Sequence, residues 1–547
     1  MHRTLHLRPR ATLLAALCGL TWLSCRSPEA FVAEADGQVY DLLHARLEAL
    51  KSGDLDFDIA PPTDSLRAKI VAGETTTVGP LTLVECLEIA AEDSERYRTE
   101  REALFLEALN LTLDRWRFGW QPTLDGGGAL SGTGGQSSSA SIDSNLRLQR
   151  LFGSGARVIG DIGASLFRVL STGDAFDLVS DLGLSVTQPL LRGFGSAITL
   201  EPLTQAERDL VYRARSYERF RRTFSVDVAT QVYGLLEAYD NLANEERNFN
   251  NLVVLRKRNE ALAEAGQMSD IQADQARQDE LRSQSRLVAL RGDLERRLDT
   301  FKLFLGLPIS CELSLDRGEF DRLTDEASLL DSLEGFNTER VVDFACAERL
   351  DVATSAQAVE DAERAVRIAA DDLRAGLDLR AGVNSTSPDG KPLSHHSDDV
   401  RWSLALDVDL PIDRLPERNA YRSSLVRFEA ERRGHERFLD RVSTDVRDAI
   451  RQARNARASY QIQVRAVQLA DRRVRSANLN LEAGRASTRD ALEAQSSLLE
   501  AQNAQTAALI DFNLAMFDLY LQLEVLRVDG DGIHVDADLV QRLLANG

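Results

Sequence analysis

Cysteine is scarce in this sequence, with five residues among 547. Cys86, Cys311 and Cys346 are scattered along the chain, and their spacing fits neither a disulfide framework nor a metal-ligand motif. We expect these side chains to behave as small buried hydrophobic groups.

The sequence also lacks long apolar runs after the N-terminal region, and it has fewer basic than acidic residues. No segment beyond the N-terminal region has the eighteen or so consecutive apolar residues that a membrane-spanning helix needs. The 65 Lys and Arg residues face 86 Asp and Glu residues, which gives a net charge of −21. Such a chain repels nucleic acid, and this class of partner is excluded.

The N-terminus has the pattern of an export signal. Arg3, Arg8 and Arg10 precede the apolar stretch Ala11 to Leu23, which is too short to span a membrane and suits a signal peptide. We therefore assign residues 1–24 to a signal peptide. Cys25 follows Ser24 and resembles the acceptor of bacterial lipoproteins, so Cys25 is the candidate lipidation site. The alternative is an ordinary signal peptide in which Cys25 has no role.

Proline avoids two long stretches, Leu203 to Leu307 and everything after Pro416. Because proline costs roughly 3 kcal/mol inside a helix, these stretches predict long helices. Apolar residues alternate in steps of three and four along much of Leu439 to Leu481, which favours a left-handed supercoil. Gly266 and Gly484 each interrupt one long helix and predict a reversal. Further helices are expected over Leu81 to Gly119 and Arg349 to Gly376.

Two blocks between the helices change to a two-residue period. Residues 121–188 are rich in glycine and serine with alternating apolar positions, and residues 377–411 repeat this pattern. Alternation predicts strands with two different faces, as in a membrane β-barrel. A soluble sandwich and a disordered linker are the alternatives.

The chain also reads as an internal duplication. Each half has the order helix, strands, long helix, glycine break, helix. The predicted organisation is a signal peptide (1–24), an N-terminal extension (25–76), a first repeat (77–308), a linker (309–346), a second repeat (347–526) and a C-terminal tail (527–547). The first repeat has the longer strand block, which leaves room for an extra hairpin at Gly153-Ser154-Gly155.

Four motifs resemble the TolC-like outer-membrane efflux protein family over about Leu81 to Leu526. They are LTLVECLEIA at Leu81 to Ala90, VTQPLLRGFG at Val186 to Gly195, LALDVDLPI at Leu404 to Ile412 and LEAGRASTRDALEAQSSLLEAQ at Leu481 to Gln502. The resemblance implies a mainly α protein with a membrane β-barrel, in which duplicated halves build a trimeric α/β-barrel channel. The barrel commonly has about twelve strands.

The resemblance also implies partners and sites. A homotrimer would sit in outer-membrane lipid and extend into the periplasm, and a periplasmic adaptor protein and an inner-membrane pump would complete the system. No cofactor is expected. Gly266, Ser269, Gly484 and Ser487 would form the adaptor-contact tips. Asp490 and Glu493 share one helix face and would line a charged aperture of the tunnel.

The sequence gives less support to other functions. His395 and His396 lie near Asp398 and Asp399, but the setting indicates an exposed loop and not a metal site. The Asp529 to Gly532 run lacks the remaining ligands of a calcium loop, and no nucleophile motif or phosphate loop is present. Catalysis is not expected. A periplasmic coiled-coil scaffold without a pore is the alternative function. Within the channel class, the sequence favours small-molecule efflux over protein secretion but does not name the substrate.

Overall fold

The computed structural model describes residues 26–50, 57–60, 64–133, 137–169, 177–319, 338–389, 391–392, 394–530 and 532–545. The predicted signal peptide, Cys25 and part of the predicted linker lie outside these residues. The chain divides into two compact units. A strand unit contains Met1–Asp58, Leu104–Arg213 and Val366–Arg422, and a helical unit contains Ile59–Ala103, Ala214–Ala365 and Ser423–Gly547. Each unit takes segments from both halves of the chain, so the repeat boundaries stay a prediction.

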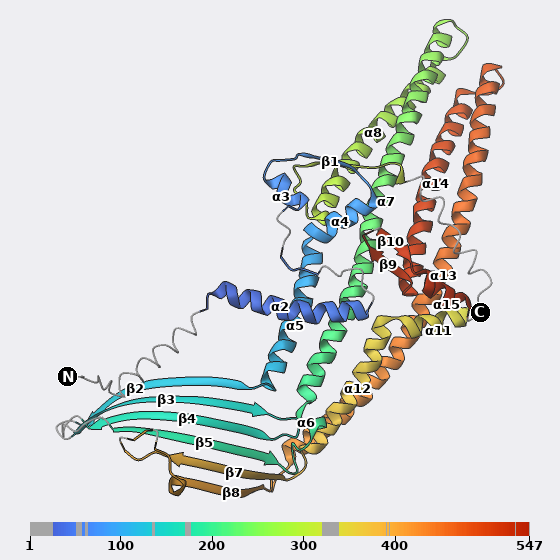
Figure 1. Cartoon of the computed structure of the whole chain (residues 1–547). Coiled ribbons are helices and arrows are strands. Elements are labelled where there is room, and N and C mark those ends of the chain that lie inside the picture. Colours follow the sequence, from blue (N-terminus) through green and yellow to red (C-terminus); the bar gives the residue numbers. More distant parts are fainter. Residues whose placement is uncertain are drawn as a thin grey trace, which may run out of the picture. The chain divides into compact units, whose positions relative to one another are not determined.

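The strand unit holds a six-stranded sheet in the order β2-β3-β4-β5-β7-β8, and every neighbouring pair is antiparallel (Figure 1). The strands are β2 (Gln121–Thr133), β3 (Ser137–Leu151), β4 (Arg157–Val169), β5 (Asp177–Pro189), β7 (Gly376–Thr386) and β8 (Val400–Asp409). These strands lie in the two blocks that the alternating pattern predicted. The pairing of β5 with β7 joins the two halves of the chain in one sheet.

The two faces of the sheet differ in polarity along every strand. Leu124, Leu146, Ile162 and Leu182 stand in register on one face across β2 to β5. Trp402 lies on the same face of β8 and is 78% exposed. The opposite face carries Thr123, Arg147 and Asp161 in register, followed by further polar residues. The predicted alternation is therefore confirmed, and its apolar face is exposed in the single chain.

The first half of the chain contributes four strands and the second half contributes two. The additional connection is the β3–β4 turn around Gly155, which has a φ of +89°. A Cβ atom on Gly155 would lie 2.6 Å from the carbonyl oxygen of Gly193, so the turn requires glycine. The backbone N–H of Gly195 donates to the carbonyl oxygen of Ser154 at 3.2 Å, and the side-chain amide of Gln188 donates to the same oxygen at 3.0 Å. The extra hairpin is thus built into the sheet.

The strand unit also contains the helix α2 (Pro28–Ala49) and two short elements, α6 (Ser196–Thr199) and a 3-10 turn (Ser397–Asp399). The Tyr40 ring of α2 packs edge-on against Phe105, with ring centroids 5.8 Å apart. In the loop between β7 and β8, both ring nitrogens of His395 contact serine hydroxyls, those of Ser180 and Ser385, at 2.9 Å.

Two long helical hairpins dominate the helical unit, although their first helices begin in the strand unit. They are α7 (Glu201–Glu264) with α8 (Asp270–Leu305), and α13 (Leu415–Glu482) with α14 (Thr488–Gln522). No proline falls within these helices beyond their first two positions, as the sequence predicted. The predicted reversals at Gly266 and Gly484 are confirmed.

One of the two further expected helices is divided, and the other begins where the sequence predicted. The stretch Leu81 to Gly119 forms two helices, α4 (Leu83–Asp93) and α5 (Glu95–Arg117), because Ser94 has an extended backbone. The second half has the same arrangement in α11 (Thr338–Glu348) and α12 (Leu350–Asp371), which meet at Arg349. Thr82 and Glu85 form a capping box at the start of α4, within the first family-like motif.

Short elements surround these helices in the helical unit. They are α3 (Leu66–Val71), the parallel pair β1 (Thr77–Leu81) and β6 (Glu312–Leu315), the antiparallel pair β9 (Leu526–Asp529) and β10 (Gly532–Val535), and α15 (Ala537–Ala545). Along α13, the predicted seam is buried at Val442, Val446, Ala449 and Ala453. Among the described residues, no helix is long and apolar enough to cross a membrane.

A buried ionic network ties α7 to the end of α14 and the start of α12. The Arg222 guanidinium contacts Glu524 at 2.5 Å and Glu218 at 3.2 Å, and the Arg222 side chain is 2% exposed. Arg219 contacts both Glu524 and Asp351. Burial raises the pKa of Glu524 and lowers the pKa of Arg222. Burial also opposes the charge of Asp351, but hydrogen bonds from Arg349 and the charge of Arg219 outweigh it and lower the Asp351 pKa.

Candidate functional site at the paired glycine turns

The two helical hairpins reverse by the same backbone device. Gly266 and Gly484 have φ of +70° and +66°, the left-handed region that favours glycine. After each glycine, the next N–H donates five residues back along the chain in a Schellman arrangement: Gln267 to the carbonyl of Leu262 at 2.9 Å, and Arg485 to that of Asn480 at 2.7 Å. The duplication is thus visible at the level of single hydrogen bonds.

A serine three residues after each glycine begins the following helix. The Ser269 hydroxyl accepts from the N–H of Ile271 at 3.3 Å, and the Ser487 hydroxyl accepts from that of Asp490 at 3.3 Å. Only at the second turn does the structure show a complete capping box, since Asp490 accepts back from the N–H of Ser487 at 2.8 Å. The equivalent position in the first turn is Gln272.

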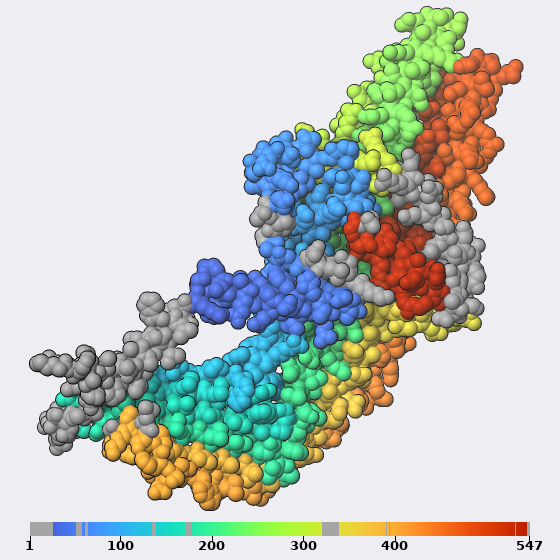
Figure 2. Space-filling model, viewed as in Figure 1, coloured from blue at the N-terminus to red at the C-terminus, as the bar shows by residue number. Residues whose placement is uncertain are grey.

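The structure brings the two turns together. The amide of Asn259 on α7 donates to the hydroxyl of Thr488 on α14 at 3.2 Å, and the same hydroxyl lies 3.9 Å from the sulfur of Met268. Thr488 and Asn259 are both fully buried. The hairpin ends project side by side in Figure 2, in green and orange. Sequence reasoning missed Asn259 and Thr488, because no local pattern reveals a partner more than two hundred residues away.

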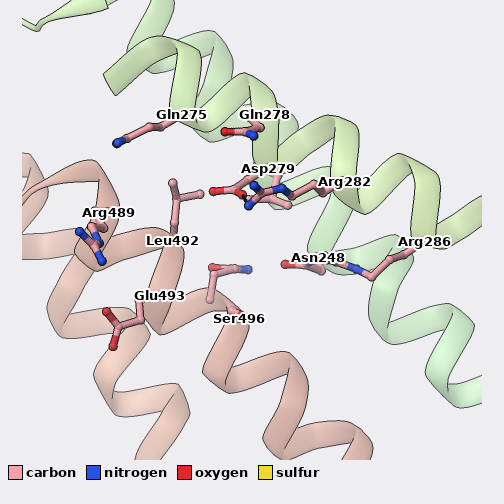
Figure 3. A pocket seen from close by; sticks show the side chains of 12 residues that line it. Asn248, Gln275, Gln278, Asp279, Arg282, Arg286, Arg489, Leu492, Glu493 and Ser496 are labelled. Carbon is pink, nitrogen blue, oxygen red and sulfur yellow. Dashed lines mark hydrogen bonds and ion pairs between the residues drawn. The ribbon is translucent and has the colours of Figure 1, made fainter. Parts of the chain in front are cut away.

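A polar cleft of about 490 Å³ lies beside these turns, between α7, α8 and α14 (Figure 3). Asp279, Arg282 and Arg286 of α8 line one side, and Arg489 and Glu493 of α14 line the other. Arg282 pairs with Asp279 at 3.1 Å, and Arg286 pairs with the buried Glu245 at 3.1 Å. The cleft therefore presents charges of both signs.

Asp490 and Glu493 share one face near the start of α14, but each has a contact within its own chain. Hydrogen bonds from the N–H and hydroxyl of Ser487 lower the pKa of Asp490. Glu493 is 61% exposed and contacts Arg473 of α13 at 2.8 Å. The place of this pair in a pore stays a prediction.

Within the described residues, no group of three or more His, Cys, Asp and Glu side chains is placed to hold a metal ion. His395 and Asp399 lie in the loop before β8, where Asp399 accepts from the backbone N–H of His396 at 3.3 Å.

A family model matches one segment of the chain. Residues 341–521, which include α12, β7, β8, α13 and nearly all of α14, match the outer membrane efflux protein family. No curated protein matches the sequence.

Solved structures extend the likeness beyond this segment. CusC, whose structures concern transmembrane channel formation, covers 82% of this chain and 94% of its own, with 14% identity and a TM-score of 0.59. The outer-membrane protein VceC from Vibrio cholerae covers 81% of this chain and 95% of its own, with 14% identity and a TM-score of 0.58. The MtrE outer-membrane channel of Neisseria gonorrhoeae, in its open state, covers 81% of this chain and 88% of its own, with 15% identity and a TM-score of 0.56.

These likenesses show that most of the chain has the fold of outer-membrane channels. The predicted resemblance to this family and the mainly helical fold class, with its strand sheet, are confirmed. The matched segment is that of efflux proteins, and the fold is that of outer-membrane channels.

Proposed function

We propose that this chain is the outer-membrane subunit of a tripartite export system and works as a homotrimer. In this proposal the protein is a passive conduit that crosses the outer membrane and extends into the periplasm. The observation that carries the proposal is the sheet, which exposes a continuous apolar face while its opposite face is polar. Exposed leucine and tryptophan side chains would be unfavourable in water on a soluble scaffold, whereas a membrane barrel presents such side chains to lipid.

Apolar side chains on the helices support self-association. Ile462 and Leu469 on α13 are 62% and 60% exposed, and with Ala466 they repeat in steps of four and three beside the buried seam. Leu479 continues the exposed apolar positions toward the turn. A helical wall needs such side chains on both flanks, because each helix contacts two neighbours. Copies of the same chain are the partners that we propose.

A conductance measurement tests this function. Purified full-length protein should form heat-resistant trimers and give single-channel current in a planar bilayer. If copies of the same chain form the hydrogen bonds of the open sheet edges, the protein should insert into the bilayer without an added partner. Monomeric protein that gives no current would refute the channel and favour the periplasmic scaffold.

The glycine turns are the proposed contact with a periplasmic adaptor, which would connect the channel to an inner-membrane pump. Gly266, Ser269, Gly484 and Ser487 lie at the end of the hairpins, and the link between Asn259 and Thr488 holds the two turns together. A partner that binds both turns at once would meet a surface already formed in the free chain, which lowers the entropy cost of binding.

Cys25 is the proposed lipid anchor. Acyl chains contribute about 0.8 kcal/mol per buried methylene to membrane binding. Replacing Cys25 with serine should abolish palmitate labelling, because serine offers no thiol for lipid attachment. The measurement is metabolic labelling of whole cells. Labelling that persists in the Cys25→Ser protein would rule out this anchor.

Asp490 and Glu493 are the proposed aperture. Three chains would bring six carboxylates to one constriction, which favours cations. Asp490→Asn combined with Glu493→Gln should weaken cation selectivity and remove block by multivalent cations. Asparagine keeps an oxygen that accepts from Ser487, so the start of α14 should persist.

Reversal potential in asymmetric salt is the measurement for this aperture. Glu500→Gln is the control, because it removes an exposed carboxylate from the same helix farther from the turn. If the double variant keeps the wild-type reversal potential and block, the pair does not line the narrow part of the pore.

A further inference from the structure

We infer that the wall shared by the trimer contains eighteen strands, six from each chain, and not the twelve or so that the family resemblance implied. This inference rests on the proposed function, since it concerns how copies of the chain close one barrel. In this arrangement, the free edge of β8 in one chain pairs with the free edge of β2 in the neighbouring chain.

The first step is that all six strands belong to one unbroken ladder. Thirteen residue pairs join β2 to β3 and thirteen join β3 to β4, without a register shift. The Gly155 turn between β3 and β4 is hydrogen-bonded to the segment after β5. Both faces keep their polarity through every strand, so no hairpin has the composition of a soluble appendage.

The second step is the chemistry of the two edges. β2 and β8 span Gln121–Thr133 and Val400–Asp409, and each has one side without a strand partner within the described sheet. Apart from Pro122 near the start of β2, neither strand carries proline or lysine, the residues that commonly protect free edges. Leu130 and Trp402 are 82% and 78% exposed on these edge strands. Such edges are suited to pairing with another chain.

The third step is direction. Neighbouring strands are antiparallel throughout, and the number per chain is even, so β2 and β8 run in opposite directions. The β8 edge of one chain can therefore pair antiparallel with the β2 edge of the next. A ring of identical chains then continues the pattern without a parallel junction, as bacterial membrane barrels require.

The fourth step is the number of chains. Six strands are fewer than the smallest membrane barrels contain, which is about eight, so one chain cannot close alone. Two chains would give twelve strands and three would give eighteen. Each chain also has four helices that join strand ends directly in sequence, namely α5, α7, α12 and α13, with the short α6 before α7.

The perimeters of the sheet and of the connecting helices agree. Strands about 4.8 Å apart and tilted by about 40° occupy roughly 6 Å each, so eighteen cover about 110 Å. Twelve helices spaced by about 9 Å also cover about 110 Å. Twelve strands from two chains would cover about 75 Å and their eight helices about 72 Å, so the match holds for either number of chains. The count of three comes from the proposed homotrimer, and its eighteen-stranded barrel is about half as wide again as a twelve-stranded one.

Two measurements on the full-length protein test this inference. Native mass spectrometry counts the chains in the assembly. Cysteine pairs then report which strand meets β8: Ser403→Cys is combined in turn with Thr123→Cys, Ala129→Cys and Ser131→Cys, which sample the polar face of β2. Cross-strand neighbours have Cβ atoms about 5 Å apart, which a disulfide can bridge. Proteins with only one introduced cysteine control for crosslinks to the native thiols. Among these thiols, burial raises the pKa of Cys86 to about 12, which disfavours its oxidation.

The expected result is three chains, with at least one Ser403–β2 pair giving a covalently closed trimer after mild oxidation. A control pair, Ser403→Cys with Ser165→Cys on β4, should give none. An assembly of two chains would overturn the inference in favour of twelve strands. Trimers in which Ser403→Cys crosslinks to β4 and not to β2 would also overturn it, since two strands would then lie outside the wall. Failure of the channel itself is separate, and would appear as monomers without bilayer current.

Discussion

Replacing Arg222 with methionine is expected to destabilise the helical unit by about 3–5 kcal/mol, because two buried carboxylates lose a shared cation. Glu218 and Glu524 are 2% and 5% exposed and both contact the Arg222 guanidinium. Methionine has a similar length but offers no donor. The lowered pKa of Arg222 shows that burial already opposes its charge. The two carboxylates offset that desolvation in the native state. In the variant each carboxylate loses one cationic partner, since Glu218 keeps Arg221 and Glu524 keeps Arg219.

The measurement is the thermal unfolding midpoint of detergent-solubilised protein. Arg291→Met is the matched control, since Arg291 pairs with Glu246 at 2.9 Å on the surface and is 60% exposed. An exposed pair contributes about 0–1 kcal/mol, so this variant should melt close to wild type. Arg222→Met combined with Glu524→Gln should recover part of the loss, because Glu218 keeps Arg221 and Asp351 keeps Arg219. Equal midpoints for Arg222→Met and Arg291→Met would show that the buried network does not stabilise the fold.

Replacing Gly484 with valine is expected to reduce pump-linked transport to background while trimers persist. No atom lies within 4 Å of a Cβ at this position, so space is not the obstacle. The obstacle is the φ of +66°, which is unfavourable for L-residues by about 1–2 kcal/mol and more so for a β-branched one. The chain would leave the Schellman arrangement and displace Ser487 and Thr488. The surface proposed for the adaptor would then change shape.

Efflux of a fluorescent dye from cells with the complete system is the readout, with heat-resistant trimers measured in parallel. Gly484→Asn is the control, because asparagine tolerates the left-handed region and should keep most transport. Wild-type efflux by the valine variant would show that this turn does not contact the adaptor. Loss of trimers in that variant would show that the turn acts in assembly instead.

Much of the architecture could be predicted from local patterns. Proline-free stretches marked α7, α8, α13 and α14, because proline is incompatible with a helix interior. Gly266 and Gly484 marked the reversals, since a left-handed residue favours glycine. Alternation marked both strand blocks. The break at Ser94 was missed, because that stretch contains neither glycine nor proline between Leu81 and Gly119.

The sequence by itself determined which residues form helices, strands and turns, because helix periodicity, strand alternation and glycine conformations depend on neighbours a few positions apart. Only the tertiary structure decided what those elements meet. β5 pairs with β7 across nearly two hundred residues, Thr488 receives the amide of Asn259, and Arg222 lies between two carboxylates in the interior. The number of strands that join in one continuous sheet was likewise decided only by the tertiary structure. Such contacts depend on how distant segments pack together, and neither residue of a distant pair carries a local pattern that names its partner.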